Sequence, residues 1–258
     1  MTGELSRLVS VASLSLRGSL RGPRLIGLAA FALVPTLIVA AIASAHPAPR
    51  ALSNAAEGLF ASLTVPIVVM VIVLVLSVGQ FRNEIDAETL VYLTDRSVSR
   101  VVIVLGKFLG ALVASLALIL PAALLPLAVA SLAGGPAYAA KVPVVLATSA
   151  LLAAAAYGGF FLLLGLVSRS ALLIGLLYGF LWEELLPLLP GDVPRLTVNF
   201  YLRDLLAREL TTGPLSGYPA PYSIPVGLAV IVFLTLLFLA MGSASLRYLE
   251  TSPEREAA

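Results

Sequence analysis

The sequence predicts an all-α integral membrane protein, and two compositional observations lead to that fold class. Sixty per cent of the 258 residues are hydrophobic and only 12% are charged, whereas a soluble domain is about half apolar and a quarter charged. The mean hydropathy of +1.04 points the same way. Helices satisfy their backbone polar groups within one segment, so they suit a chain that crosses lipid. The composition excludes a water-soluble globular enzyme and a disordered chain.

The first 24 residues predict a helix that lies in the membrane interface. This leader mixes leucines with serines and with Arg7, Arg17 and Arg21, which is the pattern of a helix half in lipid and half in water. Gly22 and Pro23 then turn the chain towards the membrane. A solvated basic tail is the alternative for this segment.

Six apolar runs are long enough to cross the hydrocarbon core, which needs about 20 residues of helix. They are 25–44, 59–78, 101–132, 142–167, 171–189 and 224–246. The third run is longer than one straight crossing needs, so its first turns up to Lys107 are expected in the headgroup zone. Pro121 and Pro126 predict a kink deeper in the same run.

Basic residues favour a cytoplasmic location for both chain ends. With six spans the two ends share one side of the membrane, and that side carries eleven of the 16 Lys and Arg residues: Arg7, Arg17, Arg21, Arg24, Arg82, Arg96, Arg100, Lys107, Arg169, Arg247 and Arg255. The positive-inside rule makes it the cytoplasmic side. Heavy use of Arg, Ala and Leu favours a prokaryotic source, and so a multi-pass protein of the cytoplasmic membrane.

Two connections are long enough to carry function. Residues 79–100 form a cytoplasmic loop in which Asp86 can cap a short helix, with Leu90 and Leu93 on one face. Its alternative is an ordinary interfacial loop. Residues 190–223 lie outside and contain an amphipathic helix over 199–210, where Asp204 and Arg208 can pair. This outer element is either an external cap or a re-entrant hairpin.

Two adjacent glutamates are the only acidic residues inside a predicted span, at Trp182-Glu183-Glu184. Three interpretations remain open: a water-lined external vestibule, an early end of the span with Trp182 at the interface, or catalysis. Tyr157 and Tyr178 belong with this group as candidate pathway residues, and helix packing is the alternative for them.

Motifs for catalysis, metal binding and nucleotide binding are missing from the sequence. His46 is the only histidine and cysteine is absent, so neither a metal site nor a catalytic triad can be assembled. Gly106-Lys107 is followed by Phe108 and does not complete a phosphate-binding loop. We therefore expect no catalytic residue, metal or cofactor in this chain. The net charge of +2 gives no reason to expect a nucleic acid partner. Gly106 with Gly110, and Ala155 with Gly159, are expected to let helices pack closely.

The stretch 84–100 and the following Gly106-Lys107 resemble the permease subunits of type-2 ABC transporters. In that family an acidic residue ends the second span, a Gly-Thr-Leu step opens a short coupling helix, a Pro-Val-Ser-Arg turn follows, and a Gly-Lys pair begins the third span. The matching positions here are Glu84, Thr89, Leu90, Val98, Ser99, Arg100, Gly106 and Lys107. Glu88 and Ser97 depart from the pattern, because glycine and proline are usual there.

The resemblance implies an export permease that is driven by other subunits. Two permease halves, identical or different, would dock on two cytoplasmic ATPase subunits, and ATP and Mg²⁺ would bind in those partners. The expected coupling residues are Glu84, Asp86, Glu88, Thr89, Leu90, Tyr92, Leu93, Arg96, Arg100 and Lys107. The expected cargo is hydrophobic or amphipathic. An intramembrane enzyme that uses Glu183 and Glu184, and a non-transporting membrane scaffold of the same fold, are the alternatives.

Overall fold

The computed structural model describes residues 2–86, 99–135, 138–210 and 221–251, and within these ranges the chain is helical with no strand. Five helical segments are long and apolar enough to cross a membrane: Pro23–Ser44, Pro49–Ile85, Arg100–Leu132, Lys141–Val167 and Ile224–Leu246. The all-α class and the multi-pass membrane character are therefore confirmed. Apolar side chains such as Leu37 and Phe233 on the outer helices are exposed, and lipid would cover them.

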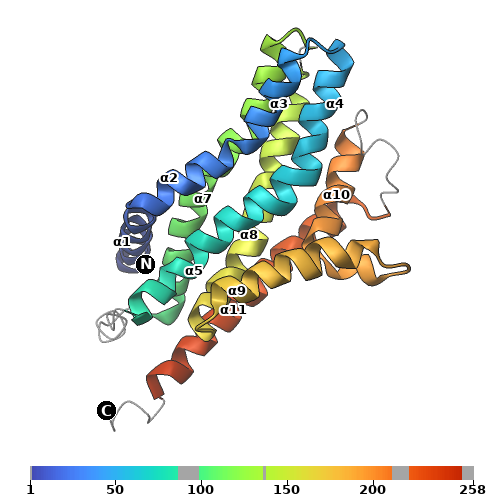
Figure 1. The fold of residues 1–258 in the computed structure, drawn as a ribbon. Coiled ribbons are helices and arrows are strands. Elements are labelled where there is room, and N and C mark those ends of the chain that lie inside the picture. Colours follow the sequence, from blue (N-terminus) through green and yellow to red (C-terminus); the bar gives the residue numbers. More distant parts are fainter. Residues whose placement is uncertain (1, 87–98, 136–137, 211–220, 252–258) are drawn as a thin grey trace.

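The first part of the chain forms an N-terminal helix and two long hydrophobic helical segments (Figure 1). The N-terminal helix α1 spans Thr2–Ser19, and a turn at Gly22, whose φ is 93°, leads into α2 at Pro23–Ala32 and α3 at Val34–Ser44. The second segment consists of α4 (Pro49–Leu59), the π-helix η1 (Phe60–Val69) and α5 (Met70–Asp86).

The second segment is longer at both ends than the sequence predicts. It begins at Pro49 rather than at residue 59, because α4 is a helix with a polar face that sequence alone places in a loop. It ends at Asp86, so residues 79–86 belong to α5 and not to the predicted cytoplasmic loop. Pro66 explains the π-helical stretch in part, since proline lacks the N–H for the usual i to i−4 hydrogen bond.

The central helices follow the predicted spans closely. They are α7 (Arg100–Leu132) and α8 (Lys141–Val167), and α7 continues through both of its prolines as one helix. The side chain of Ser99 caps α7 by accepting a hydrogen bond from the amide of Val102 at 3.4 Å. The last helix is α11 (Ile224–Thr251).

The predicted span 171–189 is not one of the five segments that could cross a membrane. It is helical but changes type twice, from α9 (Ala171–Leu177) to the π-helix η2 (Tyr178–Leu185) and then to the 3₁₀ turn η3 (Leu186–Leu188). After a further 3₁₀ turn, η4 (Val193–Leu196), the chain continues as α10 (Val198–Glu209). The predicted outer helix is therefore present, with nearly the predicted bounds.

The core lies between α5, α7 and α8. Val73, Ala114 and Ala150 are among the fully buried residues of this layer. A Cβ atom at Gly165 would lie 2.7 Å from the carbonyl oxygen of Val78, so α8 rests on the backbone of α5 there. The leucines of α10 face this core too, because Leu202 and Leu206 are buried. Figure 1 shows both ends of the described chain at the same end of the bundle.

Glycines of α7 hold the N-terminal helix in place, as the sequence predicts for Gly106 and Gly110. A Cβ atom at Gly106 would lie 2.7 Å from Cγ1 of Val11, and one at Gly110 would lie 2.5 Å from Cβ of Ser15. Successive turns of α1, at Val11 and Ser15, therefore meet successive turns of α7, and α1 packs against the first part of that helix. Glycine at both positions of α7 allows this close approach.

Candidate functional site

A buried lysine joins the two helices that flank the predicted coupling loop. Lys107, on the second turn of α7, is 2% exposed. Its Nζ donates hydrogen bonds to Oε1 of Glu84 at 2.5 Å and to the backbone carbonyl of Gln80 at 2.7 Å. It also lies 4.9 Å from the ring centroid of Phe81. A buried ammonium is costly unless it is paired, so these contacts fix α7 to the last turns of α5.

The same contact region reaches the N-terminal helix. The side-chain amide of Gln80 donates to Oγ of Ser19 at 2.6 Å, and Ser19 is the last residue of α1. The end of α1, the end of α5 and the first turns of α7 are thus joined by these contacts, and α5 and α7 are the helices on either side of residues 87–98 in the sequence. We call the four residues Ser19, Gln80, Glu84 and Lys107 the loop root.

Most of the predicted coupling residues lie outside the described residues. This group consists of Glu88, Thr89, Leu90, Tyr92, Leu93 and Arg96. Asp86 is the last residue of α5, and Arg100 is the first residue of α7. Among the predicted set, the structure therefore brings Glu84 and Lys107 into direct contact, and their side chains form the base from which the loop extends.

Glu183 is completely buried, and its carboxylate accepts four hydrogen bonds. The hydroxyl of Tyr178 donates to Oε1 at 2.6 Å and that of Tyr157 donates to Oε2 at 3.1 Å. The backbone amides of Val198 and Asn199 donate to the same two oxygens at 3.1 and 2.9 Å. These amides open α10, where the helix dipole favours a negative charge. Glu183 thus anchors the start of α10 to η2.

The neighbouring residues reinforce this joint between η2 and α10. Glu184 is half-buried, accepts a hydrogen bond from the side-chain amide of Asn199 at 3.1 Å and lies 3.8 Å from Arg203. Trp182 is 41% exposed and donates from Nε1 to the carbonyl of Leu196 at 3.1 Å. The two glutamates therefore face different surroundings, one enclosed and the other close to the surface.

The candidate pathway aromatics pack against one another in this chain. Tyr157 is 1% exposed and its ring lies 6.1 Å from that of Phe161, while the rings of Phe160 and Tyr178 are 4.4 Å apart. This arrangement agrees with the alternative interpretation of these residues, which is that they pack helices together and do not line a pathway. A vestibule lined by Tyr157 and Glu183 stays a prediction, and opening one would require η2 to separate from α8.

Sequence reasoning missed Glu57, a buried acid on α4. Its side chain is 5% exposed, and Oε2 has no hydrogen-bond partner among the described residues. The Tyr138 hydroxyl is also buried without such a partner, and burial together with the nearby Glu57 charge raises the pKa of Tyr138 to about 12. The sequence signal was Pro49, which suits the first turn of a helix that would contain Glu57.

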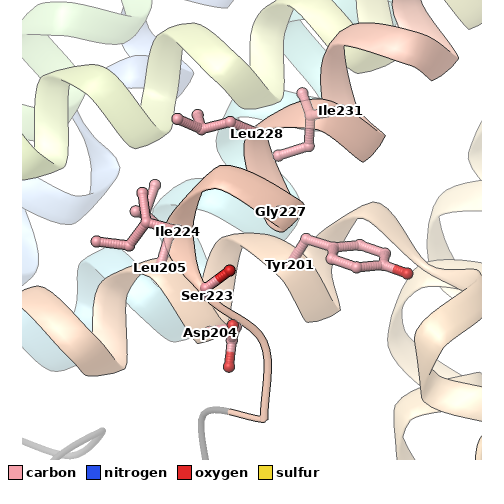
Figure 2. Close-up of a pocket in the computed structure, with 8 residues that line it drawn as sticks. All are labelled: Tyr201, Asp204, Leu205, Ser223, Ile224, Gly227, Leu228 and Ile231. Carbon is pink, nitrogen blue, oxygen red and sulfur yellow. The ribbon is translucent and has the colours of Figure 1, made fainter.

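A small pocket separates α10 from α11 (Figure 2). Figure 2 shows the polar side chains of Asp204 and Ser223 at one end of the pocket and the apolar side chains of Leu228 and Ile231 at the other. Its volume of about 10 Å³ is close to the minimum for one water molecule. The predicted contact of Asp204 with Arg208 is present, with Oδ2 at 3.9 Å from Nε, whereas Oδ1 is buried without a partner in the described part of the chain.

Replacing Asp204 by asparagine is expected to stabilise the protein at neutral pH. Burial raises the pKa of Asp204. The charge of Arg208 and the backbone of Tyr222 lower this pKa, but their effect is smaller than that of burial. A carboxyl group whose pKa is raised by folding costs stability once the pH exceeds its unfolded pKa. The melting temperature of Asp204→Asn should therefore exceed that of the unaltered protein at pH 7, and the difference should shrink as the pH falls towards 4. An equal difference at both pH values would contradict this.

Metal ligands do not gather within the described residues, where no group of three or more histidine or acidic side chains could hold an ion. No family model matches the chain, and no curated protein is similar to it at a significant level. The candidate sites are therefore judged on their residues and geometry.

Proposed function

We propose that this chain is the membrane-spanning permease subunit of an ABC exporter. A separate cytoplasmic ATPase would bind residues 87–98, and a second permease subunit would complete the pathway. The observation that carries the proposal is the loop root, where a buried Lys107–Glu84 pair joins the helices on either side of the loop. These two residues match the acid and the Gly-Lys pair of the type-2 permeases.

The loop root gives the proposal a physical means of coupling. A movement of the loop is passed on to the helices only where the loop is attached to elements that move as one unit. Here α5 and α7 are linked by Lys107, and α1 is linked to α5 through Gln80 and Ser19. Movement of the loop by an ATPase would therefore move three helices together. ATP and Mg²⁺ would be bound by the ATPase, and this chain would supply no catalytic residue.

The proposed topology has six crossings with both chain ends in the cytoplasm of a prokaryote. Five crossings are the long helical segments, and the sixth is the continuous run of α9, η2 and η3. The position of both described chain ends at one end of the bundle supports an even number of crossings (Figure 1). The eleven basic residues that the sequence assigns to the side of the chain ends support a cytoplasmic location for that side. The cargo would be hydrophobic or amphipathic.

Replacing Lys107 by methionine tests the coupling role of the loop root. Methionine has nearly the same length without the charge, and Glu84 is 29% exposed, so water can hydrate its carboxylate in the variant. We expect the helices to fold but to move independently, which should lower the stimulation of the ATPase by about tenfold. ATP hydrolysis would be measured with an ATPase that co-purifies with this chain, after reconstitution into lipid vesicles.

The matched control is Asp192→Asn, which removes an exposed ion pair with Arg195 far from the loop root in the sequence. This variant should keep full ATPase stimulation. Melting temperatures of both variants separate loss of folding from loss of coupling. Full stimulation by folded Lys107→Met would contradict the coupling role of the loop root.

A further inference from the structure

A cavity of about 750 Å³ lies between the N-terminal helix and the start of the bundle. Residues of α1, the turn at Gly22, the first turn of α2, the end of α5 and Lys107 of α7 line it. Its volume falls within the range of roughly 300–1,000 Å³ that is usual for small-molecule sites. Side chains of the loop root form one wall of this cavity, so its occupant would contact the proposed coupling region.

Three arginines make the cavity strongly basic. Arg17 lies on the last turn of α1, Arg21 in the turn and Arg24 at the start of α2. The single acidic residue in the lining is Glu84, which Lys107 already pairs. Arg24 donates to Oδ1 of Asn83 at 3.4 Å, and within the described ranges none of the three arginines pairs with a carboxylate. The cavity therefore has an excess of positive charge.

Another part of the lining is apolar and comes from α1 and α5. It consists of Val11, Leu14, Val75 and Leu76. Leu14 is 65% exposed, so the apolar wall continues onto the outer surface of α1. A ligand that fits both parts carries negative charge at one end and hydrocarbon at the other.

We propose that this cavity binds the phosphate headgroup of an anionic phospholipid from the leaflet beside α1. Arginine binds phosphate through a planar, bidentate arrangement of donors, and basic residues beside a membrane helix attract anionic lipids. The acyl chains would lie along the apolar wall. A bound lipid of this kind would hold α1 in place against α5. The position of the loop root would therefore depend on which lipids the membrane contains.

Lipid retention measured by native mass spectrometry tests the charge requirement. The intact protein would be purified in a neutral detergent and mixed with phosphatidylglycerol or with phosphatidylcholine of the same acyl chains. We expect phosphatidylglycerol to bind at least tenfold more tightly. Arg17→Gln combined with Arg21→Gln should weaken its binding by about 25-fold, at about fivefold for each arginine. The control, Arg50→Gln with Arg169→Gln, should change binding less than about twofold, because neither residue lines the cavity.

Filling the cavity tests whether the lipid binds there, and it does so without changing any charged residue. A Cβ atom at Gly18 would meet no atom within 4 Å, so the side chain of Gly18→Trp has open space where it begins, in the lining of the cavity. This variant keeps every arginine and should still lose phosphatidylglycerol. Inorganic phosphate at millimolar concentration should not displace the lipid. Equal retention of the two lipids, equal loss in the control, unchanged binding in folded Gly18→Trp, or displacement by phosphate would each overturn the proposal.

Discussion

Replacing Glu183 by alanine is expected to release α10 from η2 and to destabilise the protein by about 3–5 kcal/mol. The substitution removes an acceptor that is used by two tyrosine hydroxyls and two backbone amides. Three of the four donors, on Tyr157, Val198 and Asn199, belong to buried residues, and a buried donor without an acceptor costs about 1–3 kcal/mol. The hydroxyls can rotate towards other acceptors, whereas the amides of Val198 and Asn199 are fixed by α10.

Trp182 provides a local measurement of this effect, because it is the only tryptophan in the chain. Its indole N–H binds the carbonyl of Leu196, just before α10. In Glu183→Ala the emission of Trp182 should shift to longer wavelength, and the thermal transition should move to lower temperature. Glu184→Gln is the control, since this half-buried side chain makes one hydrogen bond and one long ionic contact. An equal effect of the two substitutions would show that Glu183 does not anchor α10.

Replacing Gly110 by valine is expected to displace the N-terminal helix from α7. Its Cβ atom would lie 2.5 Å from that of Ser15 and 2.8 Å from the carbonyl oxygen of Ala12. The second contact is with backbone, so a side-chain rotation cannot relieve it. Overpacking of this kind costs about 1–3 kcal/mol, which corresponds to a change of about fivefold to 150-fold in the docking equilibrium of α1.

A single introduced cysteine can follow the displacement, because the natural chain has none. Val11→Cys places a thiol on α1 where it faces Gly106. Its rate of labelling by a water-soluble maleimide should rise about tenfold when Gly110→Val is added. Gly27→Ala is the matched control, because a Cβ atom there meets nothing within 4 Å. Unchanged labelling in the presence of Gly110→Val would show that α1 is not held at this contact.

The parts of the fold that sequence predicts well are those set by local composition. Long apolar runs predict α7, α8 and α11 nearly to the residue, and leucine spacing predicts α10. The turn before α2 follows from Gly22 and Pro23, which suit a positive φ and the first turn of a helix. These features depend on neighbours in the sequence, so a pattern is sufficient to find them.

The features that sequence misses depend on contacts between distant residues. The segment 171–189 has the composition of a crossing, but Glu183 is anchored by amides of α10, and the helix widens to a π-helix around it. Glu57 lies outside the six predicted apolar runs, yet the fold buries it. The pairing of Lys107 with Glu84 joins residues on different helices, and no periodicity connects them.

Stimulation of a partner ATPase through residues 87–98 would show that this chain works as a permease subunit. ATP hydrolysis by an ATPase that co-purifies with this chain would be compared with and without the reconstituted protein, and then with a variant carrying Leu90→Asp and Leu93→Asp. We expect the unaltered chain to bind and stimulate the ATPase, and the folded variant, with charges on its expected contact face, to do neither. Hydrolysis that is unaffected by the chain, or equally stimulated by the variant, would contradict this role.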